Sequence, residues 1–256
     1  MNISQYNFDK DIRVINIGDV HRGDHCCDTE LLYKHIDLIA KDENTFWLST
    51  GDLLNTATRG GRHDSIHGSD ILETEFDNIC DELAPIADKC LGVVSSNHPH
   101  RVKNLTGLDL DKVMCKQLGI PYLGDFGTLN VTCGRCSYFI VMHHGSPGGG
   151  GRMKGAKINA LDGMSGIIQG ADIYLTGHTH QYMTHINERC FVDRKRNIVS
   201  YQKVYFNTCA HYLSWDDSYA QRLRLGPAPK GATEIKLGAS MNGQNSNKRV
   251  EINLLS

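Results

Sequence analysis

The chain has 256 residues, with 27 lysines and arginines against 29 aspartates and glutamates, which gives a formal charge of -2 at pH 7. This balance excludes a uniformly basic surface, so any contact with nucleic acid has to be local. No apolar stretch approaches the roughly 18 residues of a spanning helix, and the first residues lack a basic segment followed by a long apolar one. The nine cysteines, an odd number, show no paired disulfide spacing. We therefore expect a single domain over residues 1–256 in the reducing cytoplasm, without a membrane partner.

Short apolar runs, rich in β-branched residues, alternate with amphipathic stretches along the first part of the chain. The runs have the length of buried strands and end in polar clusters: IRVINIGDVH (12–21), TFWLSTGD (45–52), LGVVSSNH (91–98), YFIVMHHG (138–145) and ADIYLTGHTH (171–180). Residues 28–42 and 70–90 show helical spacing, the second interrupted by Pro85. This order predicts parallel βαβ units in an α/β fold.

The rest of the chain predicts two more helices and a set of antiparallel strands. Residues 108–119 and 158–173 have helical patterns, and residues 127–145 read as two strands joined by a turn. Cys133 and Cys136 flank that turn, and a single CxxC without a second pair indicates a hairpin rather than a metal ribbon. Beyond residue 185, alternating stretches predict antiparallel strands that close a second sheet.

Five predicted strand ends supply side chains that bind divalent cations. These are Asp19 and His21, then Asp52, then Asn97 and His98, then His143 and His144, and finally His178 and His180. Ligands of parallel sheets bind beyond the carboxyl ends of the strands, and residues two apart point to the same side of an extended chain. One such pair is weak evidence, but five in one chain predict a site for two divalent ions, without distinguishing manganese, zinc, iron and nickel.

In the same order, the segments GDVH, TGD, SNH, MHHG and TGHTH resemble the DxH, GD, GNH, H and GHxH blocks of the calcineurin-like metallophosphoesterases. The resemblance covers residues 12–182. It implies an α/β fold of two mixed β-sheets packed face to face and flanked by helices, a four-layer αββα sandwich. It also implies hydrolysis of a phosphoester by water activated between two metals, and says little about the substrate.

The resemblance implies a ligand set as well: Asp19, His21, Asp52, Asn97, His143, His178 and His180. In this set Asp52 bridges the two metals. For the central block, analogy with the family's frequent HHP form makes His143 the ligand and leaves His144 to line the site. His98 would bind a phosphoryl oxygen or protonate the leaving group, a role that suits an imidazole.

Residues 96–101 depart from the family pattern. Ser96 stands in place of a glycine, which is tolerable if the backbone does not need a positive φ. Pro99 stands in place of an acidic residue that orients the histidine, so we expect another carboxylate or a carbonyl to orient His98. Arg101 is either a solvated loop residue or a catalytic clamp on the phosphate.

Two polar segments near the strand ends leave alternatives open. Residues 145–157 are rich in glycine and form either a flap or, through Arg152, Lys154 and Lys157, a basic patch for a polyanion. Residues 58–70 form either a substrate-side loop or a solvated one; their candidate residues are Arg59, Arg62, His63 and His67.

These two segments favour a phosphodiesterase that acts on nucleic acid or a nucleotide. A phosphomonoesterase or protein phosphatase is the alternative within the same chemistry. A metal-dependent binding module without catalytic activity is the alternative from another class.

Overall fold

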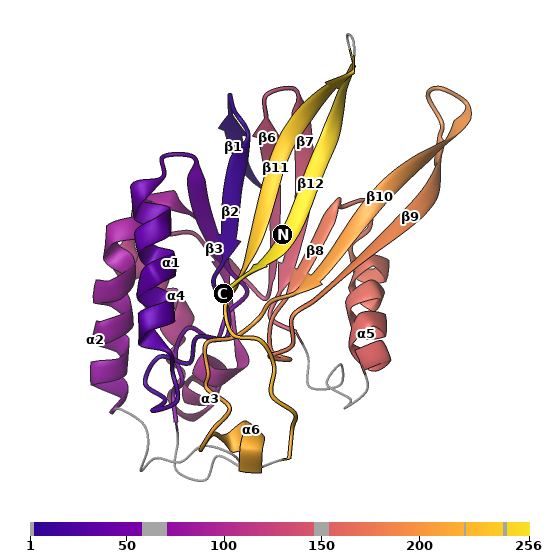
Figure 1. Ribbon diagram of the computed structural model, residues 1–256. Helices are drawn as coiled ribbons and strands as arrows, with labels where there is room; N and C mark the ends of the chain where they lie inside the picture. The colour runs from indigo at the N-terminus through magenta and orange to yellow at the C-terminus, as the bar shows by residue number, and fades with distance from the viewer. Residues whose placement is uncertain (1–2, 58–70, 146–153, 223, 243–244) are drawn as a thin grey trace.

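The computed structural model describes residues 3–57, 71–145, 154–222, 224–242 and 245–256 (Figure 1). Its strands are β1 (Ser4–Phe8), β2 (Ile12–Asn16), β3 (Thr45–Ser49), β4 (Cys90–Val94), β5 (Tyr122–Gly124), β6 (Phe126–Cys133), β7 (Cys136–His143), β8 (Ile173–Thr176), β9 (Met183–Asp193), β10 (Ile198–Thr208), β11 (Ala232–Asn242) and β12 (Asn245–Leu255). Its helices are α1 (Thr29–Lys41), α2 (Leu72–Leu83), the 3-10 helix η2 (Ala84–Lys89), α3 (Asn97–Thr106), α4 (Leu110–Leu118), α5 (Lys154–Ile167) and α6 (Tyr219–Arg222).

The strands form two mixed six-stranded sheets. One has the order β12-β11-β2-β3-β4-β5, in which β2 to β5 run parallel and β11 and β12 are antiparallel additions. The other has the order β1-β6-β7-β8-β10-β9, in which β7, β8 and β10 run parallel. The parallel strands of each sheet therefore end at a common edge, where their following loops meet.

Three apolar clusters join the sheets and helices into four layers (Figure 1). Side chains such as Leu48 and Ile140 fill the space between the two sheets. Trp47, on the opposite face of β3, packs with residues of α1, α2 and α4. Tyr174 of β8 packs with residues of α5 on the far face of the other sheet. The expected sandwich of two mixed sheets flanked by helices is confirmed.

Most elements lie where the sequence predicts them, and the differences have local causes. The predicted helix over 70–90 is divided, because Pro85 lies at the start of η2, where its missing N–H costs no hydrogen bond. The predicted turn at Gly134 and Arg135 joins β6 to β7, and Cys133 pairs with Cys136 across it. All nine cysteines are free thiols. Arg101, which one of its two alternatives placed in a loop, lies instead in helix α3.

No helix in the described part of the chain combines the length and the apolar character that crossing a bilayer requires.

Buried His35, on α1, makes the stability of the fold depend on pH. Its Nδ1 atom lies 2.7 Å from the hydroxyl oxygen of Tyr212, and burial lowers the pKa of His35 to about 4. The unfolded chain binds this proton near pH ~6.5, so the stabilisation is complete above that pH and is lost as pH falls toward the folded pKa. From about pH 7.5 to about pH 5, we expect wild type to lose roughly 2 kcal/mol more unfolding free energy than His35→Gln.

Urea unfolding of both proteins at the two pH values measures this difference. His25→Gln is the matched control, since the side chain of His25 is 46% exposed, and it should follow the wild type. The same pH dependence in wild type and His35→Gln would contradict the prediction.

Candidate metal centre

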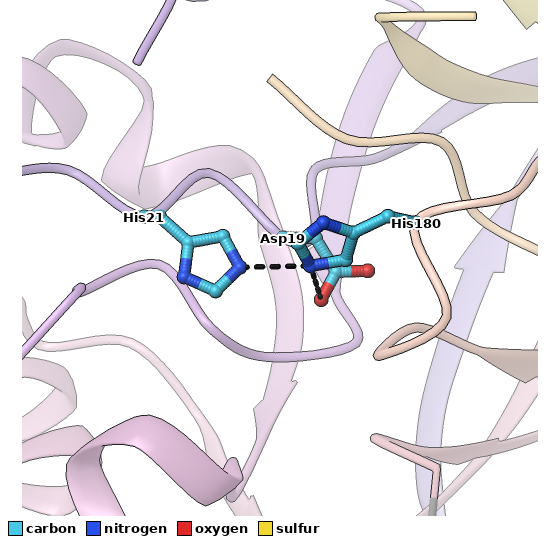
Figure 2. Close-up of side chains that lie close together, drawn as sticks. All are labelled: Asp19, His21 and His180. Carbon is cyan, nitrogen blue, oxygen red and sulfur yellow. Dashed lines mark hydrogen bonds and ion pairs between the residues drawn. The ribbon is translucent and has the colours of Figure 1, made fainter. Parts of the chain in front are cut away.

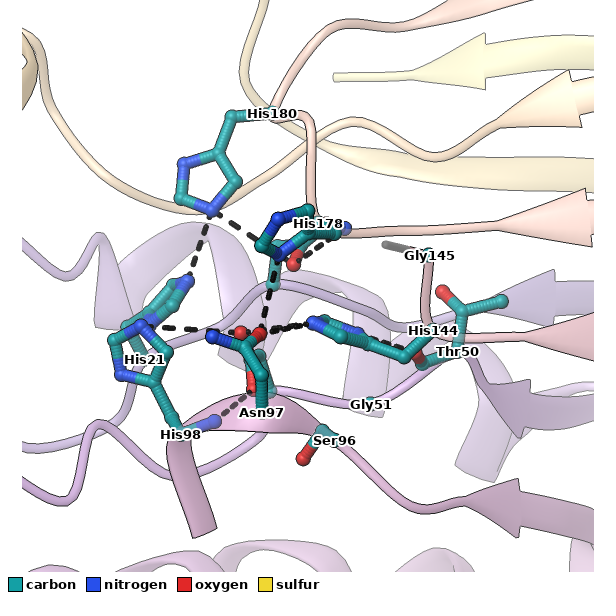
Figure 3. Close-up of polar contacts among 12 residues, drawn as sticks. His21, Thr50, Gly51, Ser96, Asn97, His98, His144, Gly145, His178 and His180 are labelled. Atoms are coloured by element: carbon teal, nitrogen blue, oxygen red, sulfur yellow. Dashed lines mark hydrogen bonds and ion pairs between the residues drawn. The ribbon is translucent and has the colours of Figure 1, made fainter. Parts of the chain in front are cut away.

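The polar clusters predicted from the sequence meet at the shared edge of the two sheets (Figure 3). The loops after β2, β3 and β4 of one sheet face the loops after β7 and β8 of the other. Together they bring eight predicted side chains into contact range of one another: Asp19, His21, Asp52, Asn97, His98, His144, His178 and His180. The centre is therefore built by both sheets and depends on their packing.

The first cluster consists of Asp19, His21 and His180 (Figure 2). The Nε2 atoms of the two histidines lie 3.0 Å apart, and Nε2 of His180 is 3.7 Å from Oδ1 of Asp19. Burial lowers the pKa of both histidines well below the usual value, which keeps the neutral imidazole that a metal requires. Two imidazole nitrogens and a carboxylate oxygen thus lie close to one another, a donor set that fits a divalent cation.

The second cluster consists of Asp52, Asn97, His144 and His178 (Figure 3). Oδ1 of Asn97 lies 2.5 Å from Nε2 of His144 and 3.1 Å from Nδ1 of His178. Nδ1 of His144 is 2.8 Å from the carbonyl oxygen of Thr50. Because that carbonyl can only accept, the Nδ1 proton points to it and Nε2 is the atom left to bind a cation.

The structure places the two central histidines in different surroundings. His144 is buried and contacts Asp52, whereas Nδ1 of His143 accepts a hydrogen bond from the backbone N–H of Gly145. The ring of His143 packs against Phe126, with centroids 4.5 Å apart. Of the two, His144 is therefore the histidine that lies within the second cluster, whereas the expected ligand His143 lies outside it.

Asp52 lies between the two clusters. Its Oδ2 atom is 3.1 Å from Nε2 of His144, and it also groups with His21 and His98. Burial tends to raise the pKa of Asp52, but the charges of His144 and His98 hold it well below its usual range. This shared position supports the bridging role expected for Asp52.

The carboxylate of Asp52 also sets the charge state of its neighbours. Burial tends to lower the pKa of His144, but the facing charge of Asp52 raises it to about 9. Burial raises the pKa of Asp19 to about 7, and the negative charge of Asp52 adds to that rise. Binding of a cation therefore has to displace protons from this centre.

Five of the clustered residues have a positive φ, which is uncommon outside glycine. The angles are 50° for Asp19, 52° for His21, 51° for Asp52, 69° for His178 and 51° for His180. Such conformations cost free energy and persist where the surrounding fold enforces them, typically at functional sites. The close approach also needs glycine at position 51, where a Cβ atom would lie 2.6 Å from Cβ of Ser96. The backbone is thus strained at the residues that form the clusters.

A backbone carbonyl orients His98, as expected from the missing acidic residue. Nδ1 of His98 lies 2.6 Å from the carbonyl oxygen of Asn55, so its proton points there and Nε2 faces the clusters. Pro99 occupies the first turn of α3, where a helix needs no backbone N–H. Ser96 has a φ of -136°, so the replacement of glycine at this position requires no strained backbone.

The structure describes only some of the basic residues that the sequence singles out. Arg101 lies on α3, half-buried, and its charge is one of the causes that lower the pKa of His178, after burial and His144. Its neighbour His100 is exposed, and Lys157 is buried on α5. Arg59, Arg62, His63, His67 and Arg152 lie outside the described residues, as does the side chain of Lys154.

Two residues at the centre were missed in the sequence. Cys209 contacts Asp19, and His211 stacks on His180 with centroids 5.1 Å apart. Both follow β10, which is parallel to β8, so they reach the same edge as the other clusters. In the sequence, NTCAHY (207–212) places polar residues directly after an apolar strand run, as the five blocks do. This pattern could have identified both residues.

No family model and no curated protein matches the chain. Among solved structures, Vacuolar Protein Sorting 29 from Cryptosporidium parvum is 15% identical, over 96% of this chain and 100% of its own, with a TM-score of 0.42. A conserved uncharacterized protein from Streptococcus pneumoniae, a predicted phosphoesterase, is 13% identical, over 94% of this chain and 98% of its own, with a TM-score of 0.37. In its sandwich of two mixed sheets and in the order of its five polar sequence blocks, the chain resembles the calcineurin-like metallophosphoesterases.

Proposed function

We propose that the protein is a two-metal phosphoesterase. The observation that carries this proposal is the convergence of two donor clusters on Asp52, with His98 directed toward them by a backbone carbonyl. Divalent cations held by the clusters would supply positive charge for the phosphoryl oxygens and lower the pKa of a water molecule. The remaining tasks, which are to orient the ester and to move a proton to the leaving group, fall to side chains of the chain itself.

His98 is the group that we assign to the leaving oxygen. Its Nδ1 proton is engaged by the carbonyl of Asn55, so a second proton on the ring has to reside on Nε2, the atom that faces the clusters. From there it can be donated to a phosphoryl oxygen or to the departing alkoxide. The side chain of His98 is 10% exposed, which limits exchange of that proton with bulk water.

Arg101 is the residue that we assign to substrate binding. It lies on the same helix as His98, and its charge contributes to lowering the pKa of His178 in the second cluster. A guanidinium presents paired N–H donors that match two oxygens of one phosphate. We place the non-reacting side of the phosphoester against this residue.

A phosphodiester of a nucleotide or nucleic acid is the substrate class that we propose, because residues 58–70 and 145–157 bring arginine and lysine close in sequence to the ligand blocks. Turnover of aryl phosphate diesters and monoesters, with manganese supplied, tests this choice. Single-stranded and duplex DNA are then compared. A strict preference for monoesters would exclude the nucleic-acid substrate and leave the phosphoesterase proposal standing.

Replacement of His98 by glutamine tests the proposed chemistry. We expect turnover of the aryl diester to fall by roughly 10²- to 10⁴-fold, because a positioned proton donor is lost. Bound manganese, measured by elemental analysis, should stay the same, since the ring is assigned to the substrate.

The matched control is His100→Gln, an exposed histidine on the same helix, which should retain wild-type turnover. Full activity of His98→Gln would refute the role given to His98. Bound manganese without hydrolysis of any phosphoester by the wild type would favour a non-catalytic binding module instead.

A further inference from the structure

Cys209 contacts one residue of the first cluster. Its sulfur is fully buried and lies 3.3 Å from Oδ2 of Asp19 and 3.3 Å from the hydroxyl oxygen of Thr50. Cys209 follows β10, Thr50 follows β3 and Asp19 follows β2, so the contact joins both sheets. A thiol thus contacts Oδ2 of the carboxylate, whereas His180 of the cluster is nearest to Oδ1.

The two oxygens of Asp19 have different surroundings. Oδ2 accepts from the backbone N–H of His178 at 2.8 Å and from the thiol of Cys209. Oδ1 accepts from the same N–H at 3.0 Å and lies 3.7 Å from Nε2 of His180. The second donor therefore marks Oδ2 as the oxygen that is held by the protein, and Oδ1 as the oxygen that faces the cluster.

Short distances to neighbouring groups surround the thiol. A Cβ atom at Gly18 would lie 2.9 Å from the sulfur, and one at Gly177 would lie 3.4 Å from it. Oγ1 of Thr50 contacts the sulfur and also lies 3.2 Å from Oδ1 of Asn16. Because a carboxylate oxygen can only accept, the S–H group donates to Oδ2 of Asp19.

We propose that Cys209, oriented by Thr50, is a positioning residue that holds Asp19 through Oδ2 and leaves Oδ1 to bind the cation of the first cluster. The inference rests on the proposed function, in which Asp19 is a metal ligand. Outer-shell partners that fix a ligand commonly change metal affinity by roughly 10- to 100-fold when they are removed. An S–H donor withdraws little charge from the carboxylate, so Asp19 stays a strong ligand while its direction is fixed.

Calorimetric titration of the metal-free protein with Mn²⁺, without substrate, tests the proposal. For Cys209→Ala we expect one of two binding events to weaken by roughly 10- to 100-fold, with the other unchanged. Cys209→Ser keeps a hydrogen-bond donor and should stay within a few-fold of wild type. Thr50→Val keeps the packing volume but removes the contact that orients the thiol, so it should show a smaller loss at the same event.

Cys133→Ala is the matched control, because Cys133 is equally buried but lies between the sheets at the β6–β7 turn. It should bind Mn²⁺ as the wild type does. Wild-type binding by Cys209→Ala, or equal losses in Cys209→Ser and Cys209→Ala, would overturn the positioning role. If Cys209→Ala does not fold, wild-type binding by Thr50→Val overturns it. Failure of the wild-type protein to bind Mn²⁺ would overturn the proposed function and this inference together.

Discussion

Asp52→Asn is expected to lower turnover of an aryl phosphate diester by roughly 10²- to 10³-fold, which corresponds to a loss of several kcal/mol of electrostatic stabilisation. The substitution keeps the size of the side chain and removes its charge. It should also reduce the amount of bound manganese per chain, because one anion is shared by both clusters. Elemental analysis and steady-state kinetics on the same preparation measure the two effects.

The reason for this large effect is the position of Asp52 between groups that all carry or attract positive charge. Oδ2 faces Nε2 of His144, and Oδ1 accepts a hydrogen bond from the backbone N–H of His98 at the start of α3. An asparagine could keep one acceptor but would turn N–H donors toward His144 or toward a cation. Two cations held side by side by these clusters would need a shared negative charge, since without it their mutual repulsion would be uncompensated.

Asp37→Asn is the control for loss of a carboxylate as such, because Asp37 lies on the exposed face of α1 with 66% of its side chain accessible. It should leave turnover and metal content unchanged. Circular dichroism checks that Asp52→Asn is folded. A folded Asp52→Asn protein with full metal content and full activity would refute the bridging role.

His144→Ala and His143→Ala are expected to differ strongly, although the residues are neighbours. Loss of His144 removes a ligand of the second cluster, and we expect turnover to fall by roughly 10²-fold or more with loss of one bound ion. Loss of His143 removes a ring that packs on Phe126, and turnover should stay within a few-fold of wild type. Metal content and turnover of the two variants, measured side by side, test this difference.

Each variant is the matched control of the other, since both remove one imidazole from the same strand end. Thermal unfolding in the absence of metal shows whether either variant loses its fold. A large loss for His143→Ala together with normal metal content for His144→Ala would restore the assignment based on the family analogy and contradict the one based on geometry.

The alternation of β7 explains why the sequence could not decide between these histidines. Val141 packs with residues of α5, and Met142 packs between the sheets. His143, the last residue of the strand, therefore points to the same side as Val141 and meets Phe126. His144 is the first residue beyond the ladder and is free to turn toward Thr50 and Asp52. The neighbouring strands determine at which residue β7 ends, and the residues HHG alone do not indicate that position.

Residues 93–101 show the same division between local and tertiary information. The pattern VVSSNHPHR predicts a strand followed by Asn97 and His98, and both lie at the centre. The missing acidic residue also predicts that another group orients His98. That this group is the carbonyl of Asn55 depends on how the loop after β3 meets the start of α3, and no side-chain pattern records the position of a backbone carbonyl.

The sequence alone predicted the α/β class, the strand ends that carry the polar clusters, and seven of the eight side chains that meet there. For the eighth it offered a pair of histidines. These features are local, since the length of an apolar run, the alternation of apolar and polar residues and the types of candidate ligands depend only on neighbouring residues in the sequence. Only the packed structure shows which central histidine faces Asp52, which carbonyl accepts from His98, and that Cys209 contacts Asp19. The reason is that these contacts join strands of two different sheets, so they exist only after the sheets have packed.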